Sequence, residues 1–253
     1  MSNNKFIQLK NPPIKEAVFG ILYSLEDDFD VTNFESFIKK VNSEFTIKNH
    51  IDKVETKIQG GNSNASTKTE KEGYLLLNED KTKAIQLRKS GFMYSINQNS
   101  YTNWENFKKE AWGYFEEFIN RYNIDSINKV SLRYINSIDL PTAISDIKEY
   151  ITISPNLPKE LDYGINRMFL QMVLPNNNID AVGIVNQNFN IGKEIGEYFS
   201  YILDIDVSIT KSRSIKELKE VKVDFDNLRD FKNEIFFESI TDKTKKLLEN
   251  EIS

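Results

Sequence analysis

The clearest pattern in the chain is an alternation of apolar and polar residues between residues 129 and 140. One side of this segment is apolar apart from Asn136, and carries Val130, Leu132, Tyr134, Ile138 and Leu140. The other side carries Ser131, Arg133, Ile135, Ser137 and Asp139. A period of two residues predicts a β-strand with one face against a core. We therefore expect a central strand of an antiparallel sheet, with an arginine on its less apolar face.

The same period predicts further strands on both sides of this segment. They cover residues 14–25, 47–59, 74–78, 84–89, 92–98, 168–174 and 199–210. Residues 181–189 fit either a strand or a helix. Turn residues separate neighbouring segments, which favours antiparallel pairing.

Helical spacing of apolar residues marks two long helices and two shorter ones. Thr32 with Glu35, and Thr102 with Glu105, have the spacing of capping boxes, so helices are expected at residues 32–45 and 102–122. The second long helix begins at Asp224 or Asp226 and is interrupted near residues 239–242. Residues 143–150 are expected to form a short helix.

The order of these elements suggests two similar halves, residues 1–126 and 127–253, packed as one compact unit. Each half has a strand, a helix, several strands and a long helix. The expected class is α+β, with antiparallel sheet or sheets backed by long helices. Two architectures remain open. One is a duplicated saddle, as in TATA-binding-protein-like domains, and the other is a single sheet gripping a long helix.

Composition narrows the chemistry. The 253 residues carry a net charge of −5, which argues against bulk nucleic-acid binding because such binding requires a basic surface. The absence of cysteine excludes disulfides, thiolate catalysis and zinc–thiolate sites. No apolar run approaches the length of a membrane helix and the start of the chain has no apolar signal region, so we expect a cytoplasmic protein without membrane contact.

Catalytic and cofactor motifs are scarce. His50 is the single histidine, and it is expected at the surface. No phosphate-binding glycine loop has the required spacing, so no cofactor is predicted. Asp139, Asp204 and Asp206 alternate along strands and could hold Mg²⁺ if they met on one face. The more ordinary interpretation is that they belong to the solvent face of the sheet.

Glu16 and Arg133 form the candidate site. Both are expected on the more polar faces of long strands. If these strands are neighbours, the two side chains would form an ion pair that fixes the strand register. Alternatively, the fork of Arg133 would clamp a carboxylate or phosphate of a ligand.

Three segments resemble a known family. Asn-Pro-Pro-Ile-Lys-Glu-Ala at residues 11–17, Arg-Tyr-Ile-Asn at residues 133–136 and Phe-Glu-Ser-Ile-Thr-Asp-Lys at residues 237–243 are similar, in order, to the motifs of a sporadically distributed, functionally uncharacterised bacterial family. The resemblance spans nearly the whole chain and supplies no activity. The scattered distribution of the family implies accessory or defence cargo that moves between genomes.

These observations favour a non-enzymatic binding protein with a protein partner. The curved sheet would offer a face or groove, and its aromatic residues suit recognition. An accessory, immunity or phage-defence role is the more specific hypothesis. The alternative is a metal-dependent enzyme that uses Asp139, Asp204 and Asp206 on a phosphorylated or nucleic-acid substrate.

Overall fold

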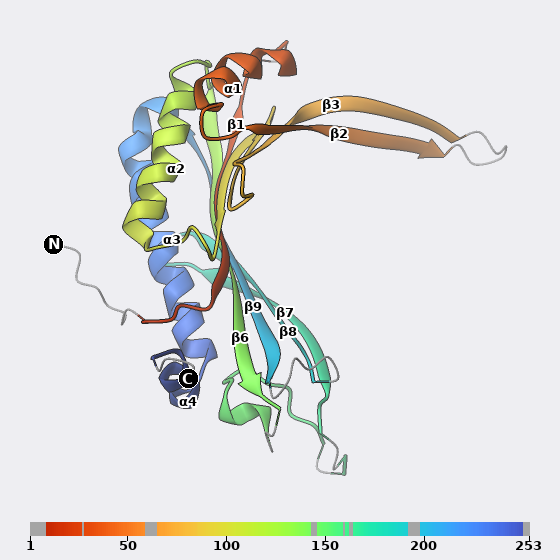
Figure 1. The fold of residues 1–253 in the computed structure, drawn as a ribbon, viewed down its shortest axis with the longest axis vertical. Coiled ribbons are helices and arrows are strands. Elements are labelled where there is room, and N and C mark those ends of the chain that lie inside the picture. Colours follow the sequence, from red (N-terminus) through yellow and green to blue (C-terminus); the bar gives the residue numbers. More distant parts are fainter. Residues whose placement is uncertain are drawn as a thin grey trace. The chain divides into compact units, whose positions relative to one another are not determined.

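The computed structural model describes residues 9–26, 28–58, 65–142, 146–158, 160–161, 164–191 and 198–249. The protein is α+β, as predicted, with a large antiparallel sheet and helices (Figure 1). The strands are β1 (Ile14–Ser24), β2 (Ile47–Ile58), β3 (Ala65–Leu77), β4 (Lys83–Arg88), β5 (Gly91–Asn97), β6 (Ser126–Pro141), β7 (Arg167–Asn176), β8 (Ala181–Asn190) and β9 (Tyr198–Ser214). Their order in the sheet is β2-β3-β4-β5-β1-β6-β9-β8-β7.

The α-helices of the described residues are α1 (Glu35–Val41), α2 (Trp104–Ile119), α3 (Leu218–Ser239) and α4 (Asp242–Glu249). Three short 3-10 helices accompany them: η1 (Val31–Phe34), η2 (Ile147–Glu149) and η3 (Ile215–Glu217). Within the described ranges, every helix is too short or too polar to cross a membrane.

The chain divides into two compact units that are discontinuous in sequence. Unit 1 comprises Met1–Ala17, Ser131–Ile209 and Lys222–Ser253, and unit 2 comprises Val18–Val130 and Thr210–Val221. The two similar halves predicted from the order of elements, residues 1–126 and 127–253, are a different division and stay a prediction. Local patterns cannot show this exchange, because β1, β6, β9 and α3 each begin in one unit and end in the other.

Unit 2 has an aromatic core between its strands and the helices α1 and α2. The aromatic stripe predicted for α2 is buried. Phe118 belongs to this stripe, and its ring contacts the rings of Tyr23, Phe37 and Phe92. Edge-to-face and tilted ring pairs of this kind add to the free energy gained by burying the rings. The stripe is therefore core, as expected.

The strands β2 and β3 continue outward from unit 2 as a two-stranded ribbon (Figure 1). The register between them shifts at Ile51 and Asp52, opposite Gly73. A Cβ atom on Gly73 would lie 1.9 Å from the backbone oxygen of Leu87 on β4. Only glycine fits here, because the backbone of β4 approaches too closely for any side chain.

Unit 1 has the helix α3 over one face of strands β6, β8 and β9. A Cβ atom on Gly183 of β8 would lie 3.1 Å from Ile235 and 3.3 Å from Phe231, both on α3. The covered face carries Leu132 and Tyr134 of β6, Val185 of β8 and Leu203 of β9, all buried. The predicted interruption is confirmed, since α3 ends at Ser239 and α4 begins at Asp242.

The predicted helix starts are wrong, by one or two residues for α1 and α2 and by more for α3. Asp30 caps η1 ahead of α1, where Thr32 was expected, and Asn103 caps α2, where Thr102 was expected. The segment before α3 uses a capping box of Ser214 and Glu217, far ahead of Asp224. For α1 and α2 a nearby residue with a short polar side chain was available, and sequence spacing alone does not choose between such neighbours.

Candidate interaction face

The face of unit 1 opposite α3 carries a hydrogen-bonded row of side chains across four strands. Gln171 of β7 donates from Nε2 to Asn186 Oδ1 of β8 at 2.7 Å, and Asn186 donates from Nδ2 to Asp204 Oδ2 of β9 at 3.2 Å. Arg133 of β6 donates from Nε and Nη2 to the two oxygens of Asp204, both at 2.8 Å. The strand register places Gln171 opposite Asn186 and Asn186 opposite Asp204. We call this arrangement the polar row.

Apolar side chains flank the polar row on the same face. On one side, Val173 of β7 lies opposite Ile184 of β8. On the other side, Phe169 of β7 lies opposite Asn188 of β8. The exposed fractions are 70% for Phe169 and 62% for Val173, and Ile184 is also exposed. Neighbouring exposed apolar residues on a rigid sheet are typical of interaction surfaces.

The charges on this face are mainly negative. Its acidic residues are Glu16 of β1, Asp139 of β6, and Asp204 and Asp206 of β9, and its basic residues are Arg133 and Arg167. The hydrogen bonds to Asp204, together with the charges of Asp206 and Glu16, raise the pKa of Arg133 despite partial burial. We call the face defined by the polar row, its apolar flanks and these carboxylates the open face.

The ion-pair partner of Arg133 is Asp204, where the sequence analysis expected Glu16. In the sheet, β6 lies between β1 and β9, so Arg133 could turn toward either strand. Asp204 accepts both guanidinium bonds, and this bidentate geometry is the stronger arrangement. Glu16 acts on Arg133 at longer range, through its charge.

Two of the three aspartates proposed as metal ligands have other partners. Asp204 is held by Arg133, and Asp139 accepts a hydrogen bond from Ser200 at 2.9 Å. In the part of the chain that the structure describes, no group of three acidic or histidine side chains could hold a metal ion. An arginine bound to the central carboxylate also opposes cation binding at that position.

The covered face of unit 1 contains polar groups of a different kind. Both amide atoms of Gln187 and the hydroxyl of Tyr201 are buried and have no hydrogen-bond partner among the residues that the structure describes. Lys232 of α3 places its ammonium 4.0 Å from the centre of the Tyr134 ring. Burial, followed by the charge of Arg229, lowers the pKa of Lys232 to about 7. The unpaired atoms of Gln187 and Tyr201 and the desolvation of Lys232 are unfavourable for the stability of unit 1.

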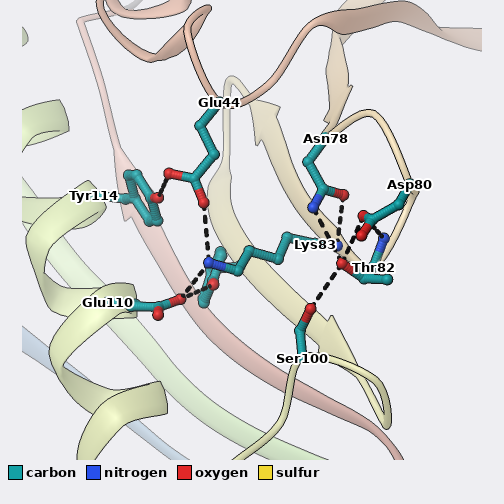
Figure 2. A network of polar contacts seen from close by, with 9 residues as sticks. Glu44, Asn78, Asp80, Thr82, Lys83, Ser100, Glu110 and Tyr114 are labelled. Atoms are coloured by element: carbon teal, nitrogen blue, oxygen red, sulfur yellow. Dashed lines mark hydrogen bonds and ion pairs between the residues drawn. The ribbon is translucent and has the colours of Figure 1, made fainter.

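A second polar cluster lies in unit 2 and is fully paired. Lys83 of β4 lies between Glu44 and Glu110, and Tyr114 donates a hydrogen bond to Glu44 (Figure 2). The Nζ atom of Lys83 is 2.9 Å from Glu44 Oε1 and 3.1 Å from Glu110 Oε2. Tyr94 of β5 donates to Glu110 at 2.6 Å. Burial alone would lower the pKa of Lys83, but its two glutamate partners raise it above the ordinary value.

This cluster joins the segment after α1, the helix α2 and the strands β4 and β5. Each of its carboxylates has both a lysine and a tyrosine as partners. We therefore interpret it as a structural clamp of unit 2 and call it the lysine clamp.

Other candidates from the sequence have structural positions. His50 is exposed on β2 and contacts the ring of Tyr74, which confirms the surface histidine. Lys243, in a short basic cluster, pairs with Glu149 at 2.5 Å and lies over the ring of Tyr150.

Sequence reasoning missed most of the open face. Gln171 and Asn186 gave no signal, because amide side chains are common in exposed strands. The exposed flanks had a usable signal: residues 168–174 are apolar on both faces of the predicted strand, although an exposed strand face is normally polar. Lys232 also had one, since it falls between the apolar helix positions Phe231 and Ile235.

A scan of the sequence against protein-family models finds no matching family, and a search of curated proteins finds no match.

Proposed function

We propose that the protein is a non-enzymatic interaction module that binds a partner protein on the open face of unit 1. The observation that carries the proposal is the exposure of Phe169, Val173 and Ile184 on a sheet face with no covering helix among the described residues. A rigid sheet presents these side chains without the cost of ordering a loop. Exposed apolar groups around a polar row match the mixture of contacts found at protein interfaces.

The partner is a protein surface with lysine or arginine beside apolar side chains. The carboxylates of Glu16, Asp139 and Asp206 surround the polar row, while Arg133 is already neutralised by Asp204. A basic partner complements this charge, and complementary charge speeds association and selects among partners. A nucleic-acid backbone would be repelled by the same carboxylates.

The fold has a finer proposed interpretation as a duplication. Outward from the centre, the strand order is β1, β5, β4, β3, β2 on one side and β6, β9, β8, β7 on the other. In each half, the strand that comes first in the sequence (β1 or β6) lies at the centre of the sheet, and the strand that comes last (β5 or β9) lies beside it. This correspondence supports a duplicated, TATA-binding-protein-like origin in which the second half has one strand fewer.

Membership of the sporadic bacterial family belongs to the same proposal. Its two main motifs, at residues 11–17 and 133–136, lie on or next to neighbouring strands β1 and β6, so the similar residues are structurally linked. The scattered distribution of that family supports an accessory or defence role, and the absence of cysteine suits a protein that works in the cytoplasm. Genes adjacent to this one would test that role, and unrelated housekeeping neighbours in several genomes would count against it.

The binding proposal is tested by affinity purification from the native host. Ile184→Lys and Asp206→Lys change the apolar flank and the charge of the open face, and each is expected to reduce partner recovery at least tenfold. Val223→Lys is the matched control, because Val223 is 56% exposed on α3 of the same unit. Recovery should also fall as salt rises, since part of the attraction is between exposed charges.

Quantitative mass spectrometry of the bound proteins gives the readout, and circular dichroism verifies that each variant is folded. The proposal is overturned if both open-face variants recover the same proteins as the wild type. It is also overturned if Val223→Lys causes an equal loss.

A further inference from the structure

The strand β7 lies at one end of the sheet order, and among the described residues its single neighbouring strand is β8. Its pairing with β8 is regular over all ten residues, with no register shift. From Met168 to Leu174 it carries no charged residue. An edge strand of this kind exposes backbone N–H and C=O groups in a straight, uncharged row that is ready to pair with another strand.

The strand β2 at the other end of the sheet order is protected. Lys48, Asp52 and Lys53 place charges along it, and its register with β3 shifts at Ile51 and Asp52. Charges and bulges are the usual devices that prevent edge-to-edge association. The sheet therefore has one protected edge and one edge whose central residues 168–174 lack these devices, with Arg167 and Pro175 near its ends.

We propose that β7 pairs antiparallel with β7 of a second copy of this chain, about a two-fold axis that passes between the two copies of Gln171. Opposed residues in an antiparallel pair lie on the same face of the sheet, so one residue of the strand must lie opposite its own copy. An axis at Gln171 or at Met172 leaves the fewest residues of Arg167–Asn176 without an opposite residue. Of these two positions, only Gln171 places Arg167 opposite Pro175.

The strand is complementary to itself about this axis. On the open face, Phe169 of one copy lies opposite Val173 of the other. On the covered face, Met168 lies opposite Leu174, and Leu170 lies opposite Met172. These three kinds of pair are apolar, Gln171 lies opposite its own copy, and no like charges oppose each other, because the single charge of Arg167 meets Pro175. Cross-strand apolar pairs of this type stabilise antiparallel sheets.

A second copy fits this edge better than a basic partner segment does. The carboxylates that would attract a basic partner lie on β1, β6 and β9, and β7 itself has none. In the dimer, the exposed apolar residues Phe169 and Val173 of the two copies would lie beside each other across the join. The pairing would also join the open faces of the two copies into one continuous surface.

Disulfide trapping tests the register directly, since the chain contains no cysteine. The variant Gln171→Cys is expected to form a disulfide-linked dimer under mild oxidation, because residues opposed in antiparallel strands lie within bridging distance. Phe169→Cys and Val173→Cys should each remain mostly unlinked alone. A mixture of these two variants should form the mixed disulfide.

Sedimentation equilibrium tests the dimer without cysteines. The wild type is expected to dimerise, and the double variant Phe169→Lys with Val173→Lys is expected to dissociate at least tenfold more readily. Val54→Lys is the control, since Val54 is 61% exposed on the protected edge β2. Circular dichroism confirms that the variants are folded.

A wild type that stays monomeric at all concentrations overturns the proposal. A dimer that survives the double substitution, or one that Val54→Lys weakens equally, overturns it as well. Failure of Gln171→Cys to cross-link, in a protein that does dimerise, overturns the register. The substitutions used for partner recovery lie on β8 and β9, so failure of the proposed function is distinguishable from failure of this dimer.

Discussion

The two units differ in how their partly buried polar groups are paired and in the charges on their edge strands. In unit 2, the lysine clamp pairs Lys83 with Glu44 and Glu110, and the edge strand β2 carries charges and a bulge. In unit 1, Gln187 and Tyr201 have buried polar atoms without hydrogen-bond partners among the described residues, Lys232 is desolvated beside an aromatic ring, and residues 168–174 of the edge strand β7 carry no charge. Unit 2 is thus arranged for stability, whereas unit 1 retains features that are unfavourable in an isolated domain. The difference is expected when one part of a protein is under selection for binding.

The largest expected effect comes from matched glycines in the two units. Gly73→Ala in unit 2 should lower the free energy of unfolding by about 3 kcal/mol or more, because the new Cβ would overlap a backbone oxygen that cannot move alone. Gly183→Ala in unit 1 should cost about 1 kcal/mol, since its Cβ meets the movable side chains of Ile235 and Phe231. Chemical denaturation measures both values.

Gly113→Ala provides the control for these glycine substitutions. Gly113 lies in α2, and nothing is within 4 Å of its Cβ position, so alanine should stabilise the helix by about 0.5–1 kcal/mol. Equal losses from Gly73→Ala and Gly183→Ala would contradict the proposed difference in backbone freedom.

Replacing a lysine by methionine should change the free energy of unfolding in opposite directions in the two units. Lys83→Met is expected to destabilise the protein by about 1 kcal/mol, because it leaves two glutamates that repel each other at a partly exposed site. Lys232→Met is expected to stabilise it by about 2 kcal/mol at pH 7 or below, since it removes a desolvated cation. Urea denaturation of both variants across pH measures these effects.

The pH dependence separates this explanation from a simple packing effect. The pKa of Lys232 is about 7 in the folded protein and higher when unfolded, so the unfolded chain binds more protons between pH 7 and about 10. The stability of the wild type should rise through that window relative to Lys232→Met, and the advantage of the variant should shrink. An advantage that is constant with pH would show that Lys232 is not desolvated.

The smallest effects concern the partner of Arg133. A double-mutant cycle of Arg133→Met with Asp204→Asn should give a coupling of about 1 kcal/mol, since the pair is bidentate but Arg133 is 44% exposed. The cycle with Glu16→Gln should give about 0.3 kcal/mol or less, because Glu16 acts only through its charge. A larger coupling with Glu16 would reverse this assignment.

Local sequence patterns predicted the helices and strands better than they predicted which of these elements lie next to each other. The alternation in β1, β6 and β9 and the aromatic stripe of α2 follow from burial of one face, which a sequence displays directly. The partner of Arg133 depends on β9 lying beside β6, and that adjacency is a property of the strand order. The exposure of Phe169 and Val173 depends on which face α3 covers. Neither property is encoded in the residues of one strand.

The division of elements between units has a consequence for synthesis on the ribosome. Residues 9–17 belong with segments that follow residue 130, and the backbone N–H of Asn11 donates to the carbonyl of Leu248 at 3.1 Å. Unit 2 likewise needs Thr210–Val221. Neither unit can therefore complete its folding before late segments of the chain have been synthesised. We expect the two units not to fold one after the other during translation, although many proteins fold domain by domain. The first residues of β1 must remain unpaired until the segments after residue 130 have left the ribosome.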